Sequence, residues 1–223
     1  MYSDFYKNGI TNISFGNDRL DSVLGDILNS NINHNFELIS KYPKTFDLRP
    51  DVINYDPIFL ESLKIHNIKN VLKATTLKEL SLFHVQVRVV EDNNSYMNWH
   101  RDTYYNHEGR LVGKAPHAIK IIYYPDFKTT QKDRLLYLVG SNRIVFPNNN
   151  LDNELFKILP ATKIQTSNNS AVLFDVNGLH AVCPEKDSRS IRLIYSFLSK
   201  QQIVDDHKDD KLHIKTMEAY ERI

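Results

Sequence analysis

The first third of the chain carries apolar residues at helical spacing. Between residues 17 and 28 an apolar side chain recurs every three or four positions, and Asn17 or its neighbour can cap the start of the helix. A second helical run begins at Ile58, directly after an Asp-Pro pair of the kind found at helix starts, and is expected to continue toward Leu72. The pattern therefore predicts a helical N-terminal region over residues 1–81.

After this region the pattern changes to short alternating runs rich in β-branched and aromatic residues, separated by segments rich in Asn, Asp, Gly and Pro. Strands are predicted at 82–90, 96–104, 117–125, 135–139, 170–176 and 189–198. Many short strands joined by turns predict a jelly roll, with residues 82–198 as its core. Residues 199–223 are expected to form a polar C-terminal tail, with a short helix near 214–222. The predicted fold class is mainly β with N-terminal helices, in one domain over residues 1–223.

Composition and charge narrow the classes of function. The 223 residues carry a formal net charge of +1, with no block of basic residues, which argues against a nucleic-acid-binding surface. No apolar run approaches the ~20 residues of a membrane span, and the N-terminus has no apolar signal core. Cys183 is the single cysteine, so an intramolecular disulfide is excluded and a reducing, cytoplasmic compartment is favoured. These properties favour a small-molecule substrate over nucleic-acid or membrane partners.

One short motif supplies candidate metal ligands. The run Trp99-His100-Arg101-Asp102-Thr103 contains a His-x-Asp pair, and His180 follows much later in the chain. On an extended segment residues i and i+2 point to the same side, so His100 and Asp102 can act together. Two imidazoles and one carboxylate are the ligand set of the facial triad, which leaves open positions on Fe(II). His100, Asp102 and His180 are the predicted metal ligands and catalytic centre.

The predicted strand that follows His180 carries two arginines, Arg189 and Arg192. An Arg next to a metal centre is a natural partner for a dicarboxylate, because its planar fork binds a carboxylate through two hydrogen bonds. The two arginines are three residues apart and lie on opposite faces of a regular strand. Arg189 shares its face with a hydrophobic series, whereas the face of Arg192 ends in Ser196. Arg192 is therefore favoured as the anion-binding residue, with Arg189 as the alternative. Residues 181–187, directly after His180, are expected to form a polar loop, and its acidic side chains are the expected partners of the other arginine.

Four segments together resemble a known family. They are the run 99–103, the strand 117–124, the turn Gly140-Ser141-Asn142-Arg143, and Leu173-Phe174-Asp175 followed by His180 and the arginine strand. In this order they resemble the phytanoyl-CoA dioxygenase-like branch of the Fe(II)/2-oxoglutarate oxygenases, over roughly residues 82 to 198. Asn142 stands where the family often has His, and the family's arginine falls between the positions of Arg189 and Arg192.

The resemblance implies a double-stranded β-helix, which is a cupin-like jelly roll, with Fe(II) held by His100, Asp102 and His180. It further implies 2-oxoglutarate as cosubstrate, its far carboxylate bound by Arg192 or Arg189, and O₂ consumed with release of succinate and CO₂. Lys120 interrupts an apolar strand and is a candidate to contact the cosubstrate, the alternative being a solvent-facing lysine. Thr103 flanks the metal motif and is a further candidate. Related halogenases lack the carboxylate, so Asp102 favours hydroxylation or another oxidation.

Two other classes of function stay open from the sequence. A jelly-roll metal protein with the same ligands can catalyse hydrolysis or isomerisation without 2-oxoglutarate, and a binding module can keep the fold without chemistry. The arginine strand argues against the binding module, and one Cys with two His does not make a usual closed zinc site. Substrate selection is expected to depend on residues 1–81, 104–116 and 126–134.

Overall fold

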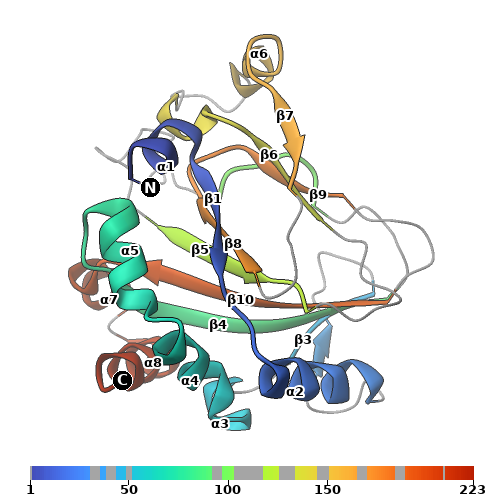
Figure 1. The fold of residues 1–223 in the computed structure, drawn as a ribbon, viewed down its shortest axis with the longest axis vertical. Coiled ribbons are helices and arrows are strands. Elements are labelled where there is room, and N and C mark those ends of the chain that lie inside the picture. Colours follow the sequence, from blue (N-terminus) through green and yellow to red (C-terminus); the bar gives the residue numbers. More distant parts are fainter. Residues whose placement is uncertain are drawn as a thin grey trace.

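A computed structural model describes most of the chain, and Figure 1 draws the order of its elements. The described residues are 2–30, 36–38, 44–48, 52–91, 97–102, 118–125, 134–144, 151–164, 170–183, 189–207 and 209–223. The helices are α1 Tyr2–Asn8, α2 Asp18–Asn29, α3 Val52–Tyr55, α4 Ile58–Ile65, α5 Ile68–Thr76, α6 Asp152–Leu155, α7 Lys200–His207 and α8 Lys211–Glu221. The strands are β1 Ile10–Ser14, β2 Phe36–Leu38, β3 Thr45–Leu48, β4 Ser81–Val90, β5 Ile119–Tyr123, β6 Arg134–Leu138, β7 Ala161–Lys163, β8 Ser170–Asp175, β9 His180–Cys183 and β10 Ser190–Leu198. A 3-10 turn, Ser141–Arg143, follows β6.

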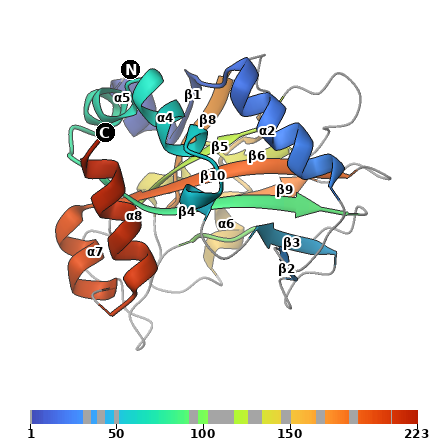
Figure 2. The ribbon, with the colours of Figure 1, turned by 90° about the horizontal axis from the view of Figure 1, so that it is seen from below.

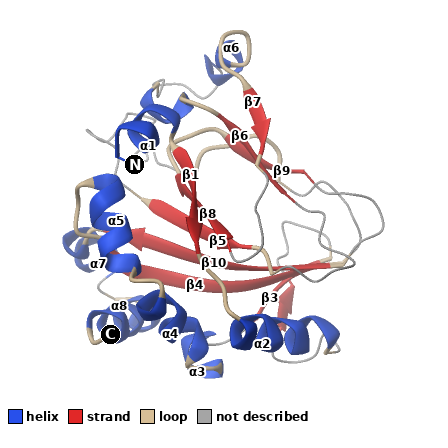
Figure 3. Cartoon of the chain, viewed as in Figure 1, coloured by secondary structure: helices blue, strands red, loops and turns tan. Residues whose placement is uncertain are grey.

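Two antiparallel sheets form the body of the molecule (Figures 1 and 3). The larger sheet has seven strands in the order β1-β8-β5-β10-β4-β3-β2, and the smaller has three in the order β7-β6-β9. One apolar core lies between the sheets and includes Tyr137 of β6 and Phe174 of β8. Helices α2, α4 and α8 cover the other face of the larger sheet (Figure 2). A mainly β protein with two facing antiparallel sheets is the architecture that the alternating runs predicted.

Strand β10 shows how the sequence pattern builds both layers. Every residue of β10 is buried, because the strand is covered on both faces. Leu193 and Tyr195 belong to the core beneath the helices, whereas Ile194 and Leu198 belong to the core between the sheets. Arg192 therefore lies on the interior face, between the sheets, as the alternation predicted.

The N-terminal region contributes strands as well as helices. β1 pairs with β8 over its whole length, and β3 pairs with β4 at the other side of the larger sheet. The expectation of a helical region over residues 1–81 was therefore incomplete. Strands of three to five residues carry too little local pattern to be recognised, and pairing with distant strands stabilises them.

The second predicted helix is broken. α4 ends at Ile65 and α5 begins at Ile68, so the continuous helix toward Leu72 is not formed. Asn67 adopts a left-handed conformation with φ of 52°, which Asn tolerates better than most residues and which a helix cannot contain. The break turns His66 back toward the N-terminal segment, where its Nε2 lies 3.1 Å from the carbonyl oxygen of Gly16.

Two strand assignments near the distal histidine also need correction. The segment after His180 was expected to be a polar loop, yet β9 runs from His180 to Cys183 and pairs with β6. A four-residue strand next to a proline has little local signal, and the partner strand determines its conformation. In the predicted strand 96–104 the described part forms a single bridge, between His100 and His180.

The C-terminal segment packs onto the fold as two helices. Asp210 caps α8 by accepting hydrogen bonds from the backbone N–H groups of Leu212 and His213, so the expected short helix begins earlier than 214. Ile203 of α7 and Met217 of α8 are buried, which ties both helices to the cores. In the part of the chain that the structure describes, the longest helices are too short and too polar to cross a bilayer.

Candidate metal centre

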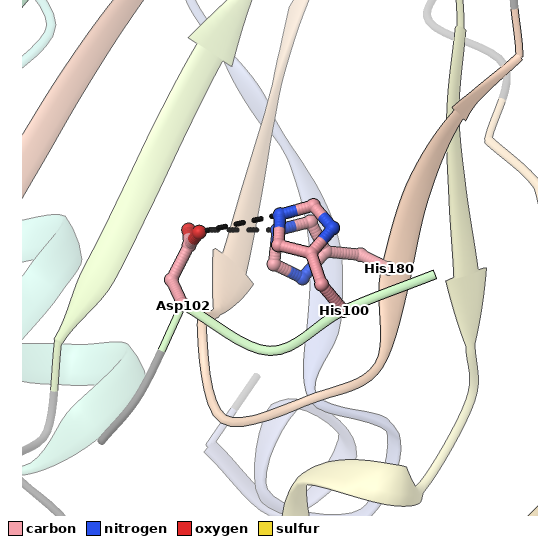
Figure 4. Close-up of side chains that lie close together, drawn as sticks. All are labelled: His100, Asp102 and His180. Atoms are coloured by element: carbon pink, nitrogen blue, oxygen red, sulfur yellow. Dashed lines mark ion pairs between the residues drawn. The ribbon is translucent and has the colours of Figure 1, made fainter. Parts of the chain in front are cut away.

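The three predicted ligands converge at one end of the space between the sheets (Figure 4). The backbone N–H of His100 donates to the carbonyl of His180 at 2.9 Å, and the reverse bond is also 2.9 Å. The backbone N–H of Asp102 donates to the carbonyl oxygen of Val176 at 3.2 Å, which holds the His-x-Asp segment against the end of β8. One nitrogen or oxygen atom from each of the three side chains lies within 4.8 Å of the others.

Each imidazole is oriented by a backbone carbonyl two residues earlier. Nδ1 of His100 lies 2.7 Å from the oxygen of Asn98, and Nδ1 of His180 lies 2.9 Å from the oxygen of Gly178. A carbonyl oxygen only accepts, so each Nδ1 carries the proton in these bonds. In the neutral rings both Nε2 atoms then present lone pairs toward Asp102. This is the arrangement of metal-ligating histidines, whose other nitrogen donates to a carbonyl or a carboxylate.

The charges around Asp102 favour its ionised form. One oxygen of Asp102 lies 2.6 Å from Nζ of Lys120, and the Nε2 atoms of His100 and His180 lie 3.4 and 3.5 Å from the carboxylate. Burial raises the pKa of Asp102, but the adjacent Lys120 ammonium opposes burial most strongly, and this pKa lies well below its ordinary range. Burial lowers the pKa of His180, with partial compensation by Asp102, so its ring is neutral at pH 7.

Two imidazoles and one carboxylate facing a common point fit a divalent transition metal. Nε2 of His100 is buried and makes no hydrogen bond of normal geometry with the described residues, as expected of an atom that serves as a ligand. Three protein ligands also leave coordination positions for other molecules, unlike a closed four-ligand zinc site. The donor set is therefore suited to a catalytic metal.

Arg101, which lies between two of the candidate ligands, was missed by the sequence analysis. Its side chain points away from the triad and is 2% exposed, and it forms an ion pair with Asp152 of α6 at 2.9 Å. It also donates to the carbonyls of Ser141 and Ile144 at 2.9 and 2.8 Å, and to that of Asn177. In a sequence, a charged residue between two candidate ligands is expected to face solvent. No local pattern therefore indicated that Arg101 is buried.

The turn Gly140–Arg143 supports the third ligand. Gly140 has φ of +86°, a left-handed conformation that favours glycine. The turn presents Ser141, which is fully buried and whose Oγ accepts a hydrogen bond from the backbone N–H of Leu179 at 2.8 Å. Arg101 and Ser141 therefore connect the His-x-Asp segment to the turn that precedes His180.

The structure places the two arginines differently. Arg192 is 3% exposed and lies on the interior face of β10, opposite Arg88 of β4. Arg88 forms a bidentate pair with Asp47 of β3 at 2.8 and 2.9 Å. Burial, with the positive charge of Arg88, lowers the pKa of Arg192 to about 9, and Asp47 opposes this shift. The guanidinium of Arg192 is thus poorly solvated.

Arg189 lies at the surface instead. Its Nε is 3.2 Å from Glu91, and its guanidinium donates to the carbonyl of Ser30 at 3.0 Å. The expected acidic partners in the loop after Cys183 lie outside the described residues, as does Thr103. Of the four predicted cosubstrate-binding residues, the structure brings Lys120 to the metal motif and Arg192 into the interior.

Comparisons with known proteins agree on the fold. Neither the protein-family models nor the curated proteins contain a match to this sequence. Among solved structures, HygX from Streptomyces hygroscopicus with nickel and 2-oxoglutarate bound is 15% identical, with a TM-score of 0.60 over 88% of this chain and 85% of that one. The α-ketoglutarate-dependent epimerase SnoN from nogalamycin biosynthesis is 11% identical, with a TM-score of 0.66 over 89% and 79%. EctD from S. alaskensis with bound Fe is 13% identical, with a TM-score of 0.64 over 89% and 75%.

These likenesses confirm the predicted fold class, a mainly β protein with helices around a double-stranded β-helix core. At such low identity they establish the fold and not the reaction or the substrate of this chain.

Proposed function

We propose that this protein is a non-haem Fe(II)- and 2-oxoglutarate-dependent oxygenase of the phytanoyl-CoA dioxygenase-like branch. The observation that carries the proposal is the convergence of Nε2 of His100, Nε2 of His180 and the carboxylate of Asp102. Support also comes from the shared fold with proteins that were crystallised with nickel and 2-oxoglutarate, or with iron.

The three side chains would hold Fe(II) on one side and leave the other side for cosubstrate and O₂. Their backbone supports orient them before the metal binds, because each Nδ1 is already engaged with a carbonyl. A metal ion would compete with Lys120 for the carboxylate of Asp102. Lys120 would then be available to a carboxylate of the cosubstrate.

Arg192 is the proposed anchor for the far carboxylate of 2-oxoglutarate. A buried guanidinium with a lowered pKa gains stability when an anion binds, and a planar fork suits a carboxylate. Arg88, opposite Arg192 on β4, is engaged in a bidentate pair with Asp47. Arg189 serves as the alternative and Thr103 as a further contact.

When bound, Fe(II) and 2-oxoglutarate supply oxidative chemistry that consumes O₂ and yields succinate and CO₂ with the oxidised substrate. The chain's own residues bind and orient these groups. The cavity beside them is lined in part by apolar side chains such as Val176 and Leu198, which would reduce the amount of water near the reaction. Because Asp102 would occupy a coordination position on the metal, hydroxylation of a small organic substrate is the proposed outcome.

An anaerobic absorption titration tests the proposal. Apo protein is given Fe(II) and then 2-oxoglutarate, and a visible metal-to-ligand charge-transfer band is expected only when all three are present. The same titration with His180→Ala should give no band, because this variant loses one of the two imidazole ligands. Protein that binds iron but shows no band with 2-oxoglutarate would instead support a metal protein that works without this cosubstrate. Protein that binds neither would support a binding module.

A further inference from the structure

A cavity of about 460 Å³ opens beside the candidate metal centre. It touches Asp102 and Lys120 at one end and reaches Gln202 and His207 of α7 at the other. Its volume falls in the range of small-molecule sites. The sequence predicted that residues 1–81 and two loops select the substrate. A cavity wall formed by α7 was not predicted.

The floor of the cavity is a row of polar side chains across three strands. His84 of β4 pairs in register with Ser196 of β10, and Ser196 pairs with Lys120 of β5. Residues in register on neighbouring strands of one sheet point to the same face. The row leads from the α7 side of the cavity to Lys120, which contacts Asp102 at 2.6 Å.

Helix α7 is held firmly enough to act as a wall. Ile203 is fully buried and anchors the helix in the core. The ring of His207 packs on Phe83 with centroids 4.8 Å apart, and Phe83 stacks on His213 of α8 at 4.4 Å. Gln202 faces the cavity, whereas the adjacent Gln201 is exposed and donates to Asp205 at 2.8 Å.

The polar groups of this wall favour an anion. Among the described residues that line the cavity, Asp102 alone is acidic, and a bound metal would neutralise it. Asp210, near His207, is already engaged by Nδ1 of His213 at 2.7 Å and by the N-cap hydrogen bonds of α8. Amide and imidazole N–H groups can donate to a carboxylate, but a cationic group would find no free counter-charge among the described lining residues.

We propose that this cavity binds the substrate and that the substrate is an organic acid. Its carboxylate lies against Gln202, His207 and His84, and its apolar body lies against Phe83, Val176 and Leu198, beside Asp102. The proposal rests on the oxygenase function proposed above. Lys120 and Arg192 remain with the cosubstrate, so the two carboxylate-binding regions are separate.

The test uses the full chain loaded with Co(II) and saturating 2-oxoglutarate, and calorimetry with hexanoate, 1-hexanol and hexylamine as probes. Saturation prevents hexanoate from occupying the cosubstrate site. Hexanoate is expected to bind more tightly than either neutral or cationic probe. Gln202→Ala and His207→Ala should each weaken hexanoate binding by about ten- to a hundredfold, as loss of one hydrogen bond to a charged group implies.

Two adjacent glutamines provide the matched control. Gln202→Glu should abolish hexanoate binding and favour hexylamine, whereas Gln201→Glu adds the same charge on the exposed side and should leave both affinities unchanged. Equal effects of the two variants, equal binding of the three probes, or no binding of hexanoate would overturn the proposal. If Co(II) and 2-oxoglutarate themselves fail to bind, the oxygenase function fails; if they bind normally, only the organic-acid proposal fails.

Discussion

Arg101 and Asp152 form a buried ion pair at 2.9 Å, with side-chain exposures of 2% and 10%. Arg101 stands between His100 and Asp102 in the chain, and its remaining donors bind carbonyl oxygens of Ser141, Ile144 and Asn177. The ion pair therefore joins the His-x-Asp segment to α6, and the hydrogen bonds of Arg101 join the same segment to the turn before His180.

Removal of one partner of this pair should be costly, because it leaves a buried charge unpaired. We expect Asp152→Asn or Arg101→Gln to lower the free energy of unfolding by about 3–5 kcal/mol, measured by urea denaturation. Arg101→Lys keeps the charge but loses the planar guanidinium that forms several hydrogen bonds at once. We expect the folded variant to bind Co(II) about 10–100-fold more weakly.

The exposed pair of Arg19 with Asp56, 3.2 Å apart, is the control for this experiment. Arg19→Ala should change stability by less than about 1 kcal/mol and leave Co(II) affinity unchanged. Normal Co(II) affinity in Arg101→Lys would contradict a positioning role for Arg101.

Substitution of a triad member should remove metal binding. We expect His100→Ala, Asp102→Ala and His180→Ala each to abolish Fe(II)-dependent turnover and tight Co(II) binding, because each removes one of the three protein ligands of the proposed centre. Co(II) absorption spectra measure binding, and far-UV circular dichroism checks the fold. The control is His66→Gln, which removes an imidazole outside the triad that contacts the carbonyl of Gly16. This variant should bind Co(II) normally. Full activity in any triad variant would refute the ligand assignment.

The two arginines should differ in their effect on the cosubstrate. Arg192→Ala should weaken 2-oxoglutarate binding by about 10–100-fold, the effect of losing a charge-assisted carboxylate contact. Arg189→Ala removes a contact with Glu91 and should change this affinity little. Titration of the charge-transfer band with 2-oxoglutarate gives both dissociation constants. A larger effect from Arg189→Ala would reverse the assignment.

Acidification should destabilise the protein partly through His66. Burial lowers the pKa of His66, although its bond to Gly16 opposes the shift. The folded state thus binds this proton more weakly than the unfolded state, whose pKa is about 6.5. The contribution of neutral His66 to stability is therefore complete above the unfolded-state pKa. It is lost as the pH falls from that pKa toward the lower pKa of His66 in the folded state.

Urea unfolding at about pH 7.5 and about pH 5.5 measures this effect. His66→Gln should show a smaller loss of stability between the two pH values than the unchanged protein. Some loss should persist, because burial also lowers the pKa of His213. An equal or larger loss in the variant would show that His66 does not contribute.

Local pattern was sufficient where one face of an element is repeatedly apolar. The helix from Asp18, with Asn17 as its cap, and the long strands β4 and β10 follow directly from spacing. The same alternation put Arg192 on the interior face. The short strands β1 and β9 lack such a run, since their conformation depends on pairing with β8 and β6.

The sequence by itself determined the chemical identity of the candidate centre, because a His-x-Asp pair, a distant histidine and an arginine strand are recognisable by residue type and order. Only the tertiary structure decided which groups surround it. The contacts of Arg101 with Asp152, of Lys120 with Asp102, and of α7 with the cavity join residues far apart in the chain. Such contacts form only when the sheets and the C-terminal helices pack, and periodicity along the chain does not encode them.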